Sequence, residues 1–353
     1  MAEGIKDIIS KAVELGASDI HLTVYRPPAF RVNGRLVTVP QAARLSIEDT
    51  KRLCLEMIPN EKILNRFEED GHVDFSISYS GLGRIRVNLY LQRGSYAAAL
   101  RLIPTIAPKL ETLGLPPIVK ELPFRGSGLI LVTGPTGSGK STTLAAIIDL
   151  LNTEMNCTIL TLEDPIEYLH RHGNCIINQR EVGTDCVSFA QGLRAALRQD
   201  PDVILVGEMR DLETISTAVT AAETGHLVMA TLHSSSADQA IERIIDVFPP
   251  HQQEQIRIQL ANTLQGIITQ QLIPRVDGKG RVLACEILVG TPAVRNLIRE
   301  GKSHLIQSVI QTGASQGMIS MEKSLKNLYQ QGLISLGEVK KRIFNYKDII
   351  PGV

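Results

Sequence analysis

The chain has 353 residues, of which 43 % are hydrophobic and 21 % charged, with 37 Lys and Arg against 37 Asp and Glu. These values are ordinary for a globular protein of two domains, and the zero net charge gives no indication of a nucleic acid or an acidic membrane as partner. The absence of tryptophan and an aromatic content of 4 % also disfavour a protein that stacks single-stranded bases on its side chains.

The cysteines and the apolar segments indicate in which cellular compartment the protein is located. Five cysteines are scattered along the chain without a CxxC pair, which is typical of reduced thiols and argues against a zinc ribbon. The sequence opens with no signal segment, and no apolar run approaches the roughly 20 residues that cross a bilayer. We therefore expect a cytoplasmic protein that reaches a membrane only through partners.

Residues 1–107 are expected to form one α+β domain. A helix is predicted at IKDIISKAVEL, whose inward face comprises Ile5, Ile8, Ile9, Ala12 and Val13. The strand DIHLTV follows, and then FRV and RLV flank Asn33-Gly34 as a hairpin with a type I′ turn. SIED at 46–49 resembles a capping box that opens another helix. Three antiparallel strands are predicted at HVDFSISYS, RIRVNLYLQRG and SYAAALRLIP.

The remainder of the chain changes character twice. Residues 108–126 are rich in proline and broken in pattern, which indicates a linker. From 127 to 290 apolar strands alternate with amphipathic helices, which predicts a mostly parallel sheet covered by helices. Residues 291–353 read as a helical C-terminal region.

A phosphate-binding loop is indicated at GPTGSGKST, which fits the pattern G-x-x-x-x-G-K-[ST] between an apolar strand and a helix. The glycines allow backbone N–H groups to close around phosphate oxygens, while Lys140 reaches the β and γ phosphates and Ser141 holds Mg²⁺. The predicted nucleotide-binding residues are Gly134, Pro135, Thr136, Gly137, Ser138, Gly139, Lys140, Ser141 and Thr142.

Three further polar side chains follow apolar strands of the predicted sheet. PDVILVGEMRD delivers Glu208 to the carboxyl edge, where it could hold the metal through water or position the attacking water. TLEDPIEY carries Glu163, Asp164 and Glu167, and such carboxylates suit general-base work on water. His233 ends HLVMATLH, where it could sense the γ phosphate.

A strand rich in arginine lies in the N-terminal domain. In GRIRVNLYLQRG, Arg84, Arg86 and Asn88 share one face, and Arg93 and Arg101 follow. Such a face could lend arginine fingers to the nucleotide of a neighbouring subunit, bind nucleic acid or acidic protein, or be a solvated face with distant salt bridges.

These segments together resemble the secretion and type IV pilus ATPases. The likeness is carried by GASDIHL, GPTGSGKSTTLAAIIDLLN, TLEDPIEY, NQREVG, LRAALRQDPDVILVGEMRDLETISTAVTAAETGHLVMATLHSSSA and ERIIDVFPP. The resemblance implies a PAS-like N-terminal domain followed by a RecA-like P-loop ATPase domain, in a homo-hexamer that uses ATP and Mg²⁺. It also implies an inner-membrane pilus platform protein as partner, at the inner face of the cytoplasmic membrane, and no nucleic acid.

Within that family the chain is most similar to retraction ATPases of twitching motility. It begins almost directly at the PAS-like domain, and PAVRNLIREGK at 292–302 is similar to the signature AIRNLIREGK of retraction motors. A pilus-assembly or secretion ATPase, or an accessory retraction ATPase that works with a second one, is the alternative; a RecA-like nucleic-acid motor is a more remote one.

The resemblance also implies roles for the candidate residues. It gives Glu163 as the catalytic carboxylate, Glu208 as the Walker B glutamate that with Ser141 serves the metal, and His233 as the histidine-box residue. The roles of Glu163 and Glu208 could be exchanged. Arginines that act in trans are expected among Arg84, Arg86, Arg93 and Arg101.

Overall fold

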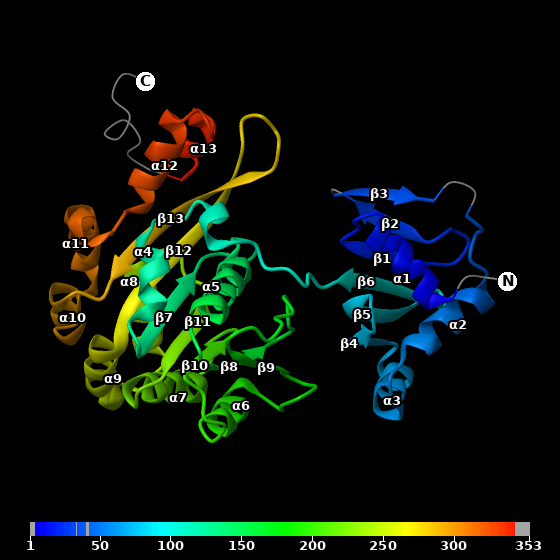
Figure 1. Cartoon of the computed structure of the whole chain (residues 1–353), viewed down its shortest axis with the longest axis horizontal. Helices are drawn as coiled ribbons and strands as arrows, with labels where there is room; N and C mark the ends of the chain where they lie inside the picture. Colours follow the sequence, from blue (N-terminus) through cyan, green and yellow to red (C-terminus); the bar gives the residue numbers. More distant parts are fainter. Residues whose placement is uncertain (1–3, 33, 40–41, 343–353) are drawn as a thin grey trace. The chain divides into compact units, whose positions relative to one another are not determined.

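The computed structural model describes residues 4–32, 34–39 and 42–342. Contacts divide the chain into two units, Met1–Ile106 with Glu167–Leu169, and Ala107–Ile166 with His170–Val353 (Figure 1). Each unit has its own sheet and its own buried hydrophobic core, so each is described by itself.

The first unit is built on a six-stranded antiparallel sheet with the order β3-β2-β1-β6-β5-β4. Its strands are β1 (Asp19–Leu22), β2 (Ala29–Val32), β3 (Arg35–Thr38), β4 (His72–Tyr79), β5 (Gly83–Gln92) and β6 (Ser95–Leu102). Its helices are α1 (Ile5–Glu14), α2 (Ile47–Met57) and α3 (Glu61–Asp70). The three predicted strands β4, β5 and β6 belong to the same sheet as the predicted hairpin of β2 and β3, because β1 pairs with both β2 and β6.

Local signals in the first unit behave largely as predicted. The Ser46 hydroxyl accepts from the Asp49 amide, and the Asp49 carboxylate accepts from the Ser46 amide, both at 3.0 Å. Val13 departs from the predicted inward face of α1, since its side chain is 46 % exposed. Val32 pairs with Arg35 in the hairpin, while Asn33 lies outside the described residues. Helix α3 was not predicted, because it is polar and buries only Phe67 among its residues.

The second unit is built on a seven-stranded sheet with the order β13-β12-β7-β11-β10-β8-β9. The neighbours are parallel except for the antiparallel pair β12 and β13. Its strands are β7 (Gly128–Thr133), β8 (Thr158–Glu163), β9 (Ile176–Glu181), β10 (Val203–Val206), β11 (Leu227–Leu232), β12 (Leu264–Pro274) and β13 (Arg281–Val289). Strand β9 was not predicted, because an edge strand buried on alternate residues can carry the half-polar sequence IINQRE.

Helices surround this sheet and continue beyond it (Figure 1). They are α4 (Ile118–Glu121), α5 (Lys140–Glu154), α6 (Phe189–Ala196), α7 (Leu212–Glu223), α8 (Ala237–Asp246), α9 (Pro250–Thr263), α10 (Pro292–Arg299), α11 (Ile306–Thr312), α12 (Met321–Gln330) and α13 (Leu336–Lys340). None of the helices in the described ranges combines the length and the apolar character that a membrane crossing requires.

The segment 108–126, expected as a linker, folds into short helices that pack on the second core. Besides α4 it contains the 3₁₀ turns Leu110–Leu113 and Leu122–Phe124. The core side chains that it contributes are Leu110, Ile118, Val119 and Leu122.

Helix α10 carries the segment similar to the retraction signature. Thr291 caps it, and Val294 and Ile298 are fully buried, so one apolar face of the helix packs against the core. The Arg295 guanidinium donates to the carbonyls of Gly290 and Leu264, at 3.0 and 3.1 Å, and also to carbonyls at the end of α9. This arginine thereby satisfies carbonyls that a helix terminus leaves without partners.

Candidate nucleotide-binding site

The predicted phosphate loop joins β7 to α5. Gly134, Gly137 and Gly139 have φ angles of 140°, 76° and 93°, which residues with a Cβ rarely adopt. A Cβ on Gly134 would also lie 2.3 Å from the carbonyl oxygen of Gln270. The loop therefore depends on glycine for its path, and it ends at the N-terminus of a 15-residue helix, where anions bind favourably.

Two side chains of the loop, Lys140 and Ser138, have polar atoms that a bound phosphate could contact. Lys140 Nζ donates to the carbonyls of Gly134 and Pro135, at 2.9 and 3.2 Å. The Ser138 hydroxyl is buried and has no hydrogen-bond partner within the described ranges. A buried hydroxyl without a partner costs stability, so its presence inside the loop fits a bound group that supplies acceptor oxygens.

Glu208 lies two residues beyond β10 and contacts the side chains of Arg210 and His233. Its carboxylate oxygens lie 2.6 Å from Arg210 Nη2 and 3.3 Å from His233 Nε2. Burial by itself raises the pKa of Glu208, but the hydrogen bond from Arg210 and the charges of His233, Arg210 and Lys140 together lower it. The carboxylate is therefore ionised, and it lies within electrostatic reach of the phosphate-loop lysine.

Glu163, the last residue of β8, is oriented by two donors. Its Oε1 accepts from Thr161 Oγ1 at 2.6 Å and from Gln179 Nε2 at 3.1 Å. These hydrogen bonds fix the direction of the carboxylate at the carboxyl edge of the sheet.

The residue before Glu208 is a glycine, and the space around it leaves no room for a side chain. A Cβ at this position would lie 3.0 Å from the Leu162 carbonyl oxygen and 3.2 Å from Glu163 Cα. The Gly207 amide also donates to that carbonyl at 2.7 Å. The strand ends that carry Glu163 and Glu208 thus approach each other closely because a glycine stands there.

The sheet order brings the candidate residues of the second unit to one edge. Strands β7, β11, β10 and β8 are neighbours in that order. The phosphate loop, His233 and Glu208 follow the first three of these strands, and Glu163 is the last residue of β8. The carboxyl ends of parallel strands share an edge of the sheet, which is where ligands bind in such folds.

The four candidate arginines belong to the first unit. Arg101 Nε lies 2.8 Å from Asp19 Oδ1, and Arg86 Nε lies 3.9 Å from Asp74 Oδ1. Arg93 is exposed and has a φ of 50°. Arg86 and Arg101 thus have acidic neighbours in their own sheet, which also agrees with the alternative of a solvated face that forms salt bridges.

The donor set at the predicted metal position is compatible with Mg²⁺. The described residues contain no group of three or more His, Cys, Asp or Glu that could hold a metal by themselves. A Ser141 hydroxyl at the start of α5 and an ionised Glu208 are oxygen donors, which Mg²⁺ prefers in combination with phosphate oxygens and water. Such a site would be completed by the nucleotide.

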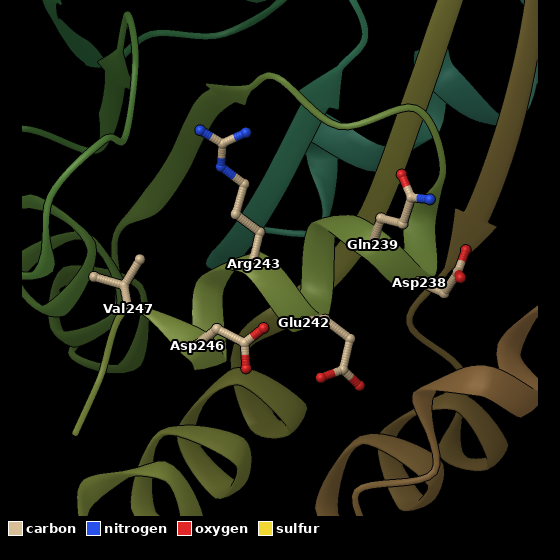
Figure 2. Close-up of a pocket in the computed structure, with 6 residues that line it drawn as sticks. All are labelled: Asp238, Gln239, Glu242, Arg243, Asp246 and Val247. Carbon is tan, nitrogen blue, oxygen red and sulfur yellow. The ribbon is translucent and has the colours of Figure 1, made fainter. Parts of the chain in front are cut away.

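A surface hollow of about 500 Å³ lies along α8 (Figure 2). Its lining is mainly acidic or polar and comprises Asp238, Gln239, Glu242, Arg243, Asp246 and Val247. Figure 2 shows Arg243 pointing away from Glu242, and its Nη1 donates to the His233 carbonyl at 2.7 Å. Acidic side chains repel phosphates, so this hollow is a poor nucleotide site, whereas Arg243 supports the loop after His233.

The other end of that loop is held by Glu286, a buried carboxylate of β13. Its Oε1 accepts from the Ala237 amide at the start of α8, at 2.8 Å, and from Gln307 Nε2 at 3.4 Å. Burial raises the pKa of Glu286, and the neighbouring Asp238 charge adds to this effect, although the hydrogen bonds from Ala237 and Gln307 oppose it.

We expect Glu286→Gln to remove a pH dependence of stability. Because the folded-state pKa is raised, the stabilising contribution of Glu286 is complete below its unfolded-state pKa, about 4.3. That contribution is lost as pH rises through the folded-state pKa. A neutral glutamine keeps an acceptor for Ala237, so thermal midpoints of the two proteins should diverge by a few degrees between pH 5 and pH 8, with the variant higher at pH 8. If the difference between the two thermal midpoints stays constant from pH 5 to pH 8, the prediction is contradicted.

Several of these side chains were not predicted from the sequence. Thr161 was detectable, because residues i and i+2 of a strand share a face and Thr161 therefore lies beside Glu163. Arg210 was detectable for its proximity to Glu208 in GEMRD. Gln179 and Glu286 had no local signal, since their partners belong to other strands and helices.

The second unit has a mostly parallel sheet in which β7 leads into a phosphate loop, while carboxylates lie at the ends of β10 and β8 on the same edge. This is the arrangement of a P-loop ATPase with a RecA-like core. The fold class expected from the sequence is confirmed, with an α+β PAS-like unit before that core. This chain belongs to the family described as "Type II/IV secretion system protein", which matches residues 1–333.

Among individual proteins, the chain is similar over most of its length to ATPases of type IV pili. The chain is 46 % identical over 340 residues to the type IV pilus retraction ATPase PilT of Pseudomonas aeruginosa, covering 96 % of this chain and 97 % of that protein. It is 44 % identical over 323 residues to the type IV pilus ATPase PilU of the same organism, covering 92 % and 84 %. A crystal structure of the pilus retraction motor PilT with bound ADP matches with a TM-score of 0.90 and 52 % identity over 98 % of both chains.

Proposed function

We propose that this protein is an ATPase motor that drives retraction of a type IV pilus. The observation that carries the proposal is the shared edge of β7, β11, β10 and β8, where an ionised Glu208 lies within reach of the Lys140 charge. The end-to-end similarity to PilT supports retraction as the work that hydrolysis performs.

The geometry supports different roles for the two carboxylates. The pKa of Glu208 is lowered, because the hydrogen bond from Arg210 and the nearby positive charge outweigh the opposing effect of burial, so this carboxylate is a weak base suited to hold metal-bound water. Hydrogen bonds from Thr161 and Gln179 direct the Glu163 carboxylate, which suits a group that orients and deprotonates the attacking water. Mg²⁺, when bound with the nucleotide, neutralises charge on the β and γ phosphates.

Lys140 and His233 complete the proposed site on this chain. Lys140 Nζ exchanges the carbonyls of Gly134 and Pro135 for phosphate oxygens. His233 is placed by Arg243 at its carbonyl and by Glu208 at its ring, so a change at the γ phosphate reaches α8 through it.

Assembly and partners are part of the same proposal. A ring of six copies with sites between subunits would allow arginines of the first unit to reach a neighbour's nucleotide. We propose a cytoplasmic location, with a platform protein of the inner membrane as the partner that receives the motion. The similarity to PilU favours one alternative, an accessory ATPase that acts beside a principal motor.

The test is replacement of the native protein by Glu208→Ala in its source bacterium, with electron microscopy of pili and a twitching assay. Excess surface pili with lost motility is the expected result, because pili would be assembled and not withdrawn. Bald cells would indicate an assembly ATPase instead. Normal piliation and motility would indicate that hydrolysis by this chain is dispensable, as for an accessory ATPase.

A further inference from the structure

A fully buried amide, Gln270 of β12, lies beneath the phosphate loop. Strand β12 runs parallel to β7, and Thr269 is paired with Thr133, the last residue of β7, with their hydroxyls 2.9 Å apart. The next residue, Gln270, therefore lies beside the point where the chain leaves the sheet to form the loop.

Gln270 contacts both ends of that loop. Its backbone carbonyl oxygen lies against Gly134, the first residue of the loop, closely enough that a Cβ there would be 2.3 Å away. Its side-chain Nε2 donates to Thr143 Oγ1 at 2.7 Å. Thr143 lies in the first turn of α5, where its amide donates to Gly139 at 3.0 Å.

The position is unfavourable for a glutamine on grounds of stability alone. Gln270 is 0 % exposed, and nearby β12 residues such as Ile268 and Ile273 are equally buried and aliphatic. Its Oε1 has no hydrogen-bond partner among the described residues. A buried acceptor without a partner destabilises the fold, and an aliphatic side chain would avoid that cost.

We propose that Gln270 is a positioning residue for nucleotide binding. Through Thr143 it fixes the first turn of α5 relative to Gly134, and this sets where Lys140 and Ser141 meet the phosphates. The amide acts through the loop and has no part in the chemical step. The inference rests on the proposed ATPase function of the loop.

The experiment compares purified Gln270→Leu, Thr143→Val and Thr143→Ser with the wild type in steady-state ATPase assays and thermal unfolding. We expect both Gln270→Leu and Thr143→Val to raise KM for ATP by about 5- to 10-fold and to change kcat by less than about twofold, the loss of one buried hydrogen bond. Thr143→Ser keeps the acceptor hydroxyl and should retain the wild-type KM.

The double variant Gln270→Leu with Thr143→Val tests whether the two side chains act as one unit. Its KM should be no higher than that of either single variant, because the same hydrogen bond is lost in each. If Gln270→Leu does not fold, Gln270→Met and Thr143→Val carry the test. A wild-type KM in the folded variants, with lower thermal midpoints, would reduce Gln270 to a core residue and overturn the inference.

Failure of the inference is distinguishable from failure of the proposed site. Lys140→Ala is assayed beside these variants. If Lys140→Ala still hydrolyses ATP, the proposed site is wrong and the Gln270 inference falls with it. If Lys140→Ala is inactive while Gln270→Leu and Thr143→Val keep the wild-type KM, the site stands and only the inference is overturned.

Discussion

Lys140→Ala is expected to abolish ATP hydrolysis. Lys140 Nζ already lies at the phosphate loop, held by the carbonyls of Gly134 and Pro135 at 2.9 and 3.2 Å. Without the Lys140 ammonium group, no cation from this side chain stabilises the negative charge that develops on the transferred phosphoryl group. Loss of one such electrostatic contact lowers kcat by about 10²–10³-fold or more. Phosphate release by the purified protein measures the effect.

Lys120→Ala is the matched control for that variant. Lys120 is an exposed lysine of the same unit, and it pairs with Glu111 and Glu154 at the surface. Its replacement should leave turnover unchanged, because exposed ion pairs contribute little and none of these residues belongs to the proposed site. Wild-type turnover by Lys140→Ala would show that the nucleotide site is elsewhere.

Glu163→Gln is expected to lower kcat by about 10²–10⁴-fold, the usual contribution of a general base. The substitution keeps the shape of the side chain and an oxygen that can accept from Thr161 and Gln179. The amide cannot take a proton from water, so ADP affinity should remain near that of the wild type while turnover is lost. Fluorescent-nucleotide titration and a turnover assay separate the two quantities.

Two further variants test whether the role of general base belongs to Glu163 and not to Glu208. Glu208→Gln should raise the Mg²⁺ concentration needed for half-maximal activity, because that carboxylate is proposed to hold metal-bound water. Glu242→Gln, at a half-buried glutamate that lines the surface hollow along α8, is the matched control and should leave kcat unchanged. If Glu163→Gln shifts the Mg²⁺ dependence and Glu208→Gln does not, the two roles are exchanged.

Local features of the chain were predictable from its sequence. The capping box at Ser46, the alternation of strands and helices from β7 to β11, and the phosphate loop depend on neighbouring residues, so they have local signals. Errors arose where local pattern and burial diverge. Val13 is exposed, and the half-polar β9 is a strand because the edge of the sheet tolerates polar side chains.

The sequence by itself determined the class of this protein, because GPTGSGKST is the pattern of a loop that binds phosphate through neighbouring backbone amides and one lysine, so its signal is local. Only the tertiary structure decided what supports that loop and its carboxylates. Gln270 and Thr143 are 127 residues apart, and Glu286 and Ala237 are 49 apart. Such pairs depend on the order of strands in the sheet, and that order follows from packing of the whole core, which no short stretch of sequence specifies.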